Sequence, residues 1–319
     1  MEDALDEAGF RHRVVPAELL AEMARSLVQL RDRGIMPEEI YSEYVGSLAC
    51  VAPEGMDEVR SLMIVAAPSP PLKVSFDLDG RQVEAVIPPT YVSTKTQTQT
   101  LELLRGVLGP AGFSVQRVAL PAKLLAVRVG LAEYGRNGIA YVEGLGSFVR
   151  LDVYATDAPL LGEGVTVEAW TPDRLPVPPR MRKCLSCAWC FHSCPTGCIS
   201  ATGDRIDPVR CLTYLNEHEG EWPVWLQPEA HNSLVGCMVC QRGCRVNEGL
   251  IASETLLATF DREETAIILK NLPEEELPTA LRSKLDVIDL AGYSTVLGRN
   301  LRALARGAAS PSQGALAEE

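Results

Sequence analysis

Hydrophobic residues in the first third of the chain form one helical stripe and several short continuous runs. Leucines and a methionine recur at helical spacing over residues 16–33, where Pro16 suits a first helical turn and Gly34 suits the end. Apolar runs at 61–67 and 82–87 have the length of strands. The pattern therefore predicts one amphipathic helix and two strands.

A similar alternation continues to residue 154. A Thr/Gln run at 94–100 leads into the leucines of a helix that Gly109 and Pro110 end. The further predicted elements are a strand, a helix and two strands, at 113–118, 121–129, 139–142 and 147–154. Strands that alternate with helices are typical of an α/β domain.

Changes in composition divide the chain into three predicted domains. Four prolines within 171–180 indicate a stiff linker. From residue 253 the chain turns polar, with predicted helices at 264–272 and 299–305, and a tail from 307 to 319 whose composition predicts disorder. The predicted domains are residues 1–175, 176–250 and 251–319.

The charge balance and the termini restrict the class of protein. The chain has 30 Lys and Arg against 42 Asp and Glu, a formal net charge of −12, and no long basic run. Such a balance repels a phosphate backbone and argues against a nucleic-acid partner. The acidic N-terminus lacks the apolar region of a signal peptide, and no apolar run approaches membrane length. A cytoplasmic protein without a membrane partner is predicted.

Nine of the ten cysteines lie between residues 184 and 244. The first run reads C-x2-C-x2-C-x3-C-P and ends at Pro195, and a second run, C-x2-C-x3-C, begins at Cys237. The first spacing is that of bacterial ferredoxins, whereas a structural zinc site needs four ligands and usually shows two C-x2-C pairs without the third repeat. The spacing predicts a ferredoxin-like module with two [4Fe–4S] clusters, under reducing conditions.

Glycines crowd the segment that precedes the linker, at Gly130, Gly135, Gly138, Gly144 and Gly146. So many glycines indicate tight turns, or a backbone that a bulky ligand approaches closely. A glycine-rich hairpin without a ligand explains the pattern equally well. The spacing is not G-x-G-x-x-G, so no dinucleotide site is predicted.

Taken in order, these segments resemble a known family. Gly130-Leu-Ala-Glu-Tyr-Gly-Arg-Asn-Gly138, then Gly146-Ser-Phe, then Thr156-Asp-Ala-Pro-Leu160, then the two cysteine runs with Cys211 between them, resemble epoxyqueuosine reductases. The cytoplasmic relatives of corrinoid reductive dehalogenases are similar more distantly. The resemblance implies an α/β or α+β fold: a corrinoid-reductase-like α/β domain for cofactor or substrate, the two-cluster module and a short helical C-terminal segment.

The resemblance also implies ligand sets. One cluster would be held by Cys184, Cys187, Cys190 and Cys244, and the other by Cys194, Cys211, Cys237 and Cys240. Cys198 is then either a buried free thiol or a ligand in place of Cys211. A corrinoid such as cobalamin would lie against Gly130, Gly135, Asn137, Gly138, Gly146 and Ser147.

One feature that bears on catalysis departs from the family. Its acidic proton donor belongs to a strand that corresponds to residues 113–121, where this chain has no Asp or Glu. Tyr134 and Arg136 therefore become the candidate catalytic residues, as proton donor and as fixed cation. Alternatively, Arg136 pairs with a carboxylate such as Glu133 or Asp157 and serves the local structure.

These observations predict an iron–sulfur oxidoreductase that passes electrons through two clusters to a bound corrinoid or a small substrate. Because the acidic donor is missing, the expectation is an enzyme related to epoxyqueuosine reductases that does not act as one. The alternative is a non-catalytic partner that reduces the corrinoid or metal centre of another protein. A ferredoxin or flavodoxin is the expected electron donor.

Overall fold

The structure, a computed structural model, describes residues 2–161, 180–203, 206–250 and 255–307. The predicted linker, apart from Arg180, and the predicted disordered tail beyond Gly307 lie outside these residues. The chain falls into two compact units, Met1–Ser69 with Thr94–Cys187, and Pro70–Ser93 with Ala188–Glu319. The segment Pro70–Ser93 thus belongs with the second half of the chain, and the three-domain division stays a prediction.

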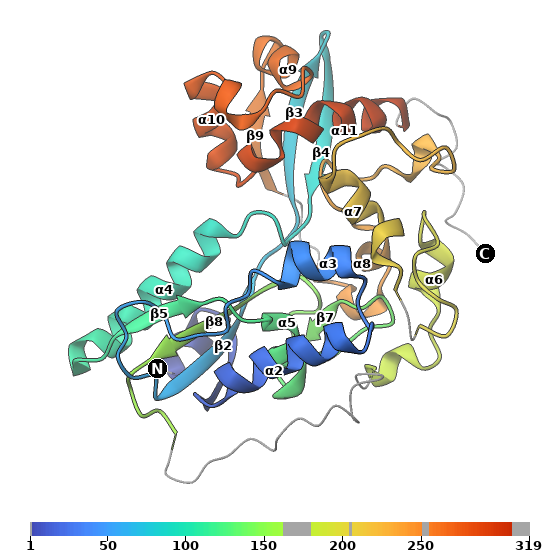
Figure 1. The fold of residues 1–319 in the computed structure, drawn as a ribbon. Coiled ribbons are helices and arrows are strands. Elements are labelled where there is room, and N and C mark those ends of the chain that lie inside the picture. Colours follow the sequence, from blue (N-terminus) through green and yellow to red (C-terminus); the bar gives the residue numbers. More distant parts are fainter. Residues whose placement is uncertain (1, 162–179, 204–205, 251–254, 308–319) are drawn as a thin grey trace. The chain divides into compact units, whose positions relative to one another are not determined.

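The first unit is built on a four-stranded sheet in the order β1-β2-β8-β5 (Figure 1). The strands are β1 (Arg11–Pro16), β2 (Ser61–Pro68), β8 (Val149–Thr156) and β5 (Val115–Val118). Every neighbouring pair is antiparallel. Three of these strands were predicted. Strand β1 was not predicted, because its sequence, RHRVVP, begins with three charged or polar residues. Pro16, which was expected to open a helix, is instead the last residue of this strand.

Both faces of this sheet are buried, which explains the continuous apolar run of β2. Leu62, Ile64 and Ala66 pack with helices α2 (Leu19–Asp32) and α5 (Ala122–Arg128). Met63 and Val65 pack on the other face with α1 (Glu2–Glu7) and α4 (Thr94–Leu108). Each such side chain contributes about 1.5–3 kcal/mol by its burial. The unit therefore has three layers.

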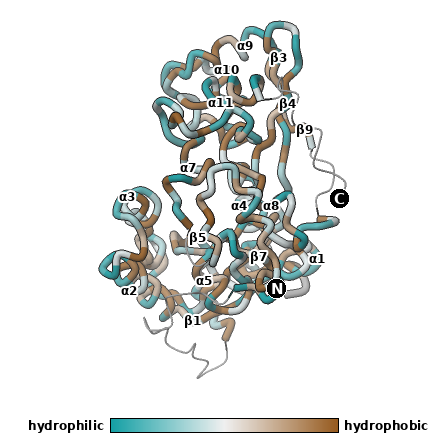
Figure 2. Tube along the Cα trace, turned by 90° about the vertical axis from the view of Figure 1, so that its right-hand side faces the viewer, coloured by the Kyte–Doolittle hydropathy of each residue, from teal (hydrophilic) through white to brown (hydrophobic). Residues whose placement is uncertain are grey.

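The helical stripe predicted at 16–33 is confirmed as α2, which begins at Leu19. Figure 2 shows hydrophobic and hydrophilic colours alternating along α2, as expected for a helix with one buried face. A short helix, α3 (Glu38–Ile40), follows it. The helices predicted at 121–129 and around residue 101 are confirmed as α5 and α4, and the Thr/Gln run is itself the start of α4.

The glycine-rich segment forms a short hairpin of β6 (Ala132–Tyr134) and β7 (Ala140–Val142). Gly130, Gly138 and Gly146 have φ angles of 71°, 69° and 59°. These left-handed conformations favour glycine because other residues are strained there. Tight turns therefore account for these three positions.

The second unit has a three-stranded sheet in the order β4-β3-β9. Its strands are β4 (Arg81–Ile87), β3 (Leu72–Leu78) and β9 (Thr255–Phe260). β3 pairs antiparallel with β4 and parallel with β9. The expectation of helical structure from residue 253 is wrong for β9, whose side chains are mostly exposed at the sheet edge and therefore show no strand-like alternation.

Three helices complete the core of the second unit: α9 (Arg262–Ile268), α10 (Thr279–Asp286) and α11 (Ser294–Gly307). The helix predicted at 264–272 begins two residues earlier because Asp261 and Glu264 form a capping box around its first turn. The helix predicted at 299–305 is the centre of α11. Leu297 and Leu301 of α11 pack with Phe76 and Phe260, whose rings stack at 4.9 Å.

The described chain is a mixed α/β fold with antiparallel pairing in its larger sheet. The α/β expectation is confirmed at this level. Among the described residues, no helix is both long and apolar enough to cross a membrane.

Candidate metal centre

The two cysteine runs share one spacing and one local structure. Cys190 lies in the helix α6 (Trp189–Ser193), and Cys240 lies in the helix α8 (Val239–Arg242). Cys194 and Cys244 each follow the helix in an extended conformation, with φ and ψ of −64° and 116° and of −76° and 120°. The sequence C-x2-C-x3-C therefore folds in the same way twice, as expected of a module that holds two like clusters.

A close contact ties these two short helices together. A Cβ atom at Gly243 would stand 1.9 Å from Nε1 of Trp189. No other residue fits at position 243 without displacing the indole, although Trp189 is itself 51% exposed. The indole of Trp189 on α6 therefore packs directly over Gly243, at the end of α8, and a larger residue there would displace this half-exposed ring.

Several polar groups surround the predicted sulfur ligands. Nδ2 of Asn232 donates a hydrogen bond to Sγ of Cys237 over 3.3 Å, and its Oδ1 accepts from the backbone N–H of Met238. Sγ of Cys194 lies 3.5 Å from Oγ1 of Thr196. Hydrogen bonds of this kind to ligand sulfurs are among the features that set cluster potentials.

Cys198, the surplus thiol, is buried beside two of the predicted ligands. Its Sγ lies 3.5 Å from Sγ of Cys194, and it also interacts with Cys211. The hydrogen bond from Cys198 lowers the pKa of Cys194 to about 4, which favours the thiolate form that binds iron. Both roles predicted for Cys198 stay open.

The eight predicted ligands are thiols of intermediate exposure. Among the described residues, no three Cys, His, Asp or Glu side chains converge as ligands of a single metal ion. The donor set fits iron–sulfur clusters, which are held by cysteine thiolates. The assignment of individual ligands stays a prediction.

Helix α11 fixes the segment between Cys211 and Cys237 near both of its ends. Nδ2 of Asn300, which is fully buried, donates to the carbonyls of Asn216 and Leu234, each over 2.8 Å. A Cβ at Gly298 would stand 2.5 Å from the carbonyl oxygen of Ile268. Gly298 thus permits the close approach of α11 to the end of α9, while Asn300 bonds the cysteine-bearing segment.

The glycine-rich hairpin holds the chain segment that leads into the first cysteine run. The carbonyl of Tyr134 accepts from the N–H of Met181 over 2.8 Å. The guanidinium of Arg136, 9% exposed, donates to the carbonyls of Cys187 and Cys184 over 3.0 and 3.3 Å. Arg136 therefore fixes the backbone of two predicted ligands, while Asp157, one of its predicted partners, accepts from Ser114 instead. Its catalytic role stays a prediction.

We expect Arg136→Gln to lower the reduction potential of the cluster assigned to Cys184 and Cys187. Removal of a buried positive charge that donates to the carbonyls of two predicted ligands makes an added electron less favourable, so we expect the potential to fall by roughly 50 mV or more. Potentiometric titration followed by electron paramagnetic resonance measures the shift. Arg136→Lys, which keeps the charge, is the matched control, and equal potentials in all three proteins would refute the expectation.

The other residues predicted to touch a corrinoid have partners within the hairpin. A Cβ at Gly135 would lie 2.5 Å from the Tyr141 ring and 2.6 Å from Oδ1 of Asn137. Asn137 donates to the Tyr141 hydroxyl over 3.0 Å. Ser147 is 5% exposed. The packing of the hairpin itself explains these residue types, so it gives no support to a corrinoid, which stays a prediction.

Tyr134 is half-buried in the same hairpin. Its hydroxyl has no hydrogen-bond partner in the part of the chain that the structure describes, and Nζ of Lys123 lies 5.9 Å from its ring centre. Burial raises the pKa of Tyr134 to about 12, so the phenol keeps its proton at neutral pH. The protonated O–H group can donate, but the raised pKa makes it a weaker general acid than an ordinary tyrosine, because general acids work best with a pKa near the operating pH.

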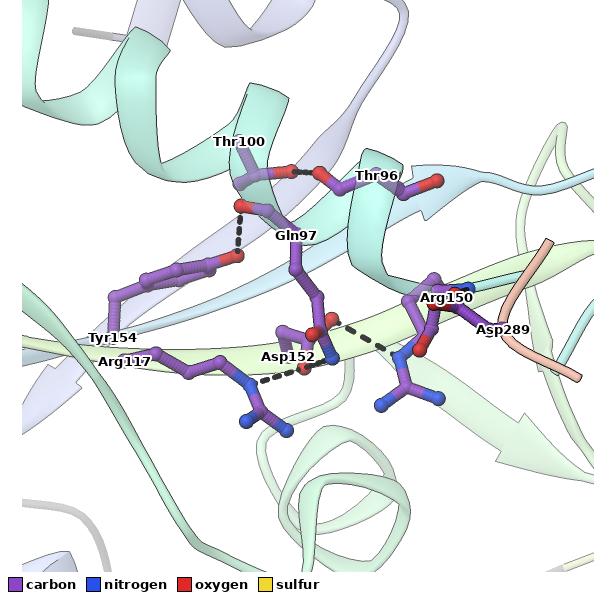
Figure 3. Close-up of polar contacts among 9 residues, drawn as sticks. Thr96, Gln97, Thr100, Arg117, Arg150, Asp152, Tyr154 and Asp289 are labelled. Carbon is purple, nitrogen blue, oxygen red and sulfur yellow. Dashed lines mark hydrogen bonds and ion pairs between the residues drawn. The ribbon is translucent and has the colours of Figure 1, made fainter. Parts of the chain in front are cut away.

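A carboxylate that the sequence analysis did not single out lies next to the strand where the family's acidic donor is missing. Asp152 of β8 is 5% exposed and accepts from Nε of Arg117 and Arg150 over 2.8 and 3.1 Å, and from Nε2 of Gln97 over 3.0 Å (Figure 3). Both carboxylate oxygens are occupied. Asp152 thus has a structural role: it links β8 to β5 through Arg117 and to α4 through Gln97.

Comparisons with known proteins agree with the cysteine pattern. Residues 183–247 match the family described as a 4Fe-4S double cluster binding domain. The prediction of two [4Fe–4S] clusters is confirmed at this level.

The resemblance to epoxyqueuosine reductases is confirmed in sequence and in fold. The epoxyqueuosine reductase of Burkholderia pseudomallei is 32% identical over 168 residues, which are 52% of this chain and 39% of that protein. A structure of the Bacillus subtilis epoxyqueuosine reductase superposes with a TM-score of 0.62 at 18% identity, over 96% of this chain and 81% of that one. The matches span less than half the length of these two curated relatives, 39% of the Burkholderia pseudomallei protein and 48% of the epoxyqueuosine reductase of Pseudomonas aeruginosa.

Two predictions are wrong in the light of these comparisons. The chain was expected not to act as an epoxyqueuosine reductase, yet the named relatives and structural neighbours are themselves epoxyqueuosine reductases. A nucleic-acid partner was predicted to be unlikely on net charge. However, an epoxyqueuosine reductase crystallised with an epoxyqueuosine-modified tRNA stem loop has the same fold, with a TM-score of 0.59 at 17% identity over 96% of this chain and 80% of that one. Net charge is a poor guide because phosphate contacts depend on the local placement of cations.

Proposed function

We propose that this protein is a cytoplasmic iron–sulfur oxidoreductase of the epoxyqueuosine reductase type, with a modified tRNA as its substrate. The observation that carries the proposal is the 32% identity to a named epoxyqueuosine reductase over 168 residues. This stretch is longer than the matched cluster domain at 183–247, so the similarity extends beyond the cluster ligands.

The two clusters, when bound, supply single electrons. Removal of an epoxide oxygen as water breaks both of its C–O bonds, forms a carbon–carbon double bond, and consumes two electrons and two protons. A ferredoxin or flavodoxin is the proposed source of the electrons. The chain's own residues must position the clusters and deliver the protons. Arg136 and the Tyr134 carbonyl support the first task through their contacts with Cys184, Cys187 and Met181.

Tyr134 is the proposed proton donor. Residues 113–121 contain no Asp or Glu, and Asp152 is committed to two arginines and a glutamine. Tyr134 keeps a proton at neutral pH and has an unused hydroxyl among the described residues. The unused, protonated hydroxyl supports the role that an acidic residue fills in the family, whereas the raised pKa makes Tyr134 a weaker proton donor than a carboxylic acid. The proposed role of Tyr134 does not depend on whether a corrinoid carries the electrons from the clusters to the substrate. Cobalt quantification on anaerobically purified protein tests for the corrinoid.

Complementation of a deletion strain tests both the function and the donor. We expect loss of the gene to remove queuosine from tRNA and to accumulate its epoxide, and the wild-type gene to restore queuosine. Tyr134→Phe should slow the reduction by about 100- to 10,000-fold, the usual contribution of a general acid, with unchanged iron content. Mass spectrometry of tRNA nucleosides measures both species. Normal queuosine in the deletion strain would overturn the function, and full activity of Tyr134→Phe would overturn the donor.

A further inference from the structure

A pocket of about 640 Å³ lies in the second unit, along helix α11, and both apolar and charged side chains line it. Its volume is within the range of ligand-binding sites, roughly 300–1,000 Å³. Arg299, Arg302 and Arg306 line it, and their spacing of three and four residues places them on one face of the helix. A cationic face therefore exists on a chain whose net charge is −12.

The three arginines differ in how far their charge is already used. Arg299 donates to the carbonyls of Gly220 and Leu215 over 2.8 and 2.9 Å, and its guanidinium lies 3.8 Å from the ring centre of Trp222. Burial lowers the pKa of Arg299, whereas the nearby carboxylates of Glu219 and Glu221 raise it. The negative charges of Glu219 and Glu221 thus balance the positive charge of Arg299, whose hydrogen bonds hold the neighbouring loop in place.

Arg302 and Arg306 are exposed, and their charges remain available. Arg302 uses one nitrogen for the carbonyl of Leu269, at 2.5 Å. Arg306 has no hydrogen-bond or ion-pair partner among the described residues. Two cations one helical turn apart fit consecutive phosphates of an extended polyanion better than they fit a single small anion.

Two aromatic side chains line the pocket beside α11, and one of them, Trp222, contacts Arg299 of that helix. Trp222 and His231, whose rings are 4.4 Å apart, both line the pocket. Trp225 does not itself line the pocket, but it stands in the chain between two residues that do, Trp222 and Leu226. It is 39% exposed, and the guanidinium of Arg210 lies 4.5 Å from its ring centre. An exposed indole next to cations is the combination on which unpaired bases stack in RNA-binding proteins.

We infer that this pocket and its rim form an RNA-binding site, where Arg302 and Arg306 contact backbone phosphates and Trp225, in the loop that supplies Trp222 and Leu226 to the pocket, stacks on an unpaired base. The inference rests on the proposed function, because it places the tRNA substrate on the second unit. It also explains how an acidic protein binds RNA: the helical spacing of α11 concentrates positive charge that no basic run in the sequence reveals.

Salt-dependent binding of a tRNA anticodon stem loop tests the site. Each phosphate contact contributes about 0.9 to the slope of log affinity against log salt concentration. We therefore expect the double variant Arg302→Gln/Arg306→Gln to reduce the magnitude of the slope by about 2. Trp225→Ala should weaken binding by about tenfold without changing the slope. Fluorescence anisotropy on the anaerobic holoprotein measures both quantities.

The matched control is Arg262→Gln/Arg282→Gln, which removes the same formal charge from exposed positions of α9 and α10 where each arginine pairs with a carboxylate. This variant should keep the wild-type slope. An unchanged slope in the pocket variant, or an equal loss in both double variants, would overturn the inference. Wild-type protein that neither binds the stem loop nor restores queuosine would refute the proposed function instead, so the two failures are distinguishable.

Discussion

Replacing Cys237 by alanine will reduce the iron content of the anaerobically purified protein from about eight atoms per chain to about four. Cys237 begins the second cysteine run and accepts a hydrogen bond from Asn232. A cubane that loses one of its four thiolates is left with an open iron site. The cluster assigned to Cys194, Cys211, Cys237 and Cys240 should therefore be lost, while the other is kept. Iron and sulfide quantification measures the change.

Cys198→Ala and Cys211→Ala are the matched variants. If Cys198 is a free thiol, its replacement leaves about eight irons, and replacement of Cys211 gives the same loss as that of Cys237. The opposite result would make Cys198 the ligand in place of Cys211. Retention of about eight irons in Cys237→Ala would contradict the ligand set implied by the family.

Periodicity and spacing predicted the elements that hydrophobic burial alone specifies. The apolar stripe of α2 and the apolar run of β2 belong to one hydrophobic core. The spacing of their buried residues is therefore visible in the sequence itself. Strand β9 carries no such pattern because its side chains are mostly exposed. Its place beside β3, more than 170 residues earlier in the chain, depends on backbone pairing. Local sequence does not encode a parallel partner at that separation.

The candidate site was predictable where the residue type itself carries the chemistry. Cysteine spacing revealed the clusters because thiolates are their ligands. The partners of Arg136 were not predictable, since they are backbone carbonyls, which every residue has. Asp152 was missed for a related reason, because its arginines and its glutamine come from three different elements. The arginines of α11 could have been found by testing basic residues for helical spacing.

Protonation of His231 will destabilise the second unit as the pH falls below about 6.5. His231 is 5% exposed, and its Nδ1 has no hydrogen-bond partner among the described residues. Burial, together with the charge of Arg299, lowers its pKa to about 4. The unfolded chain therefore binds this proton at a higher pH than the folded chain does. The stabilising contribution is complete above pH 6.5 and is lost progressively between 6.5 and about 4, to a total of about 3 kcal/mol.

Comparison with His231→Phe isolates this proton from the carboxylates that titrate in the same range. Phenylalanine keeps an aromatic ring beside Trp222, which lies 4.4 Å from the histidine ring, but it cannot take up a proton. Denaturant unfolding between pH 5 and 8 under anaerobic conditions measures the difference in stability between the two proteins. It should be constant above pH 7 and should shift by about 2 kcal/mol in favour of the variant at pH 5, since one proton per chain changes stability by about 1.4 kcal/mol per pH unit. A difference that stays constant throughout would show that His231 titrates alike in the folded and unfolded chain. The wall of the pocket beside α11 would then be hydrated, in conflict with its burial.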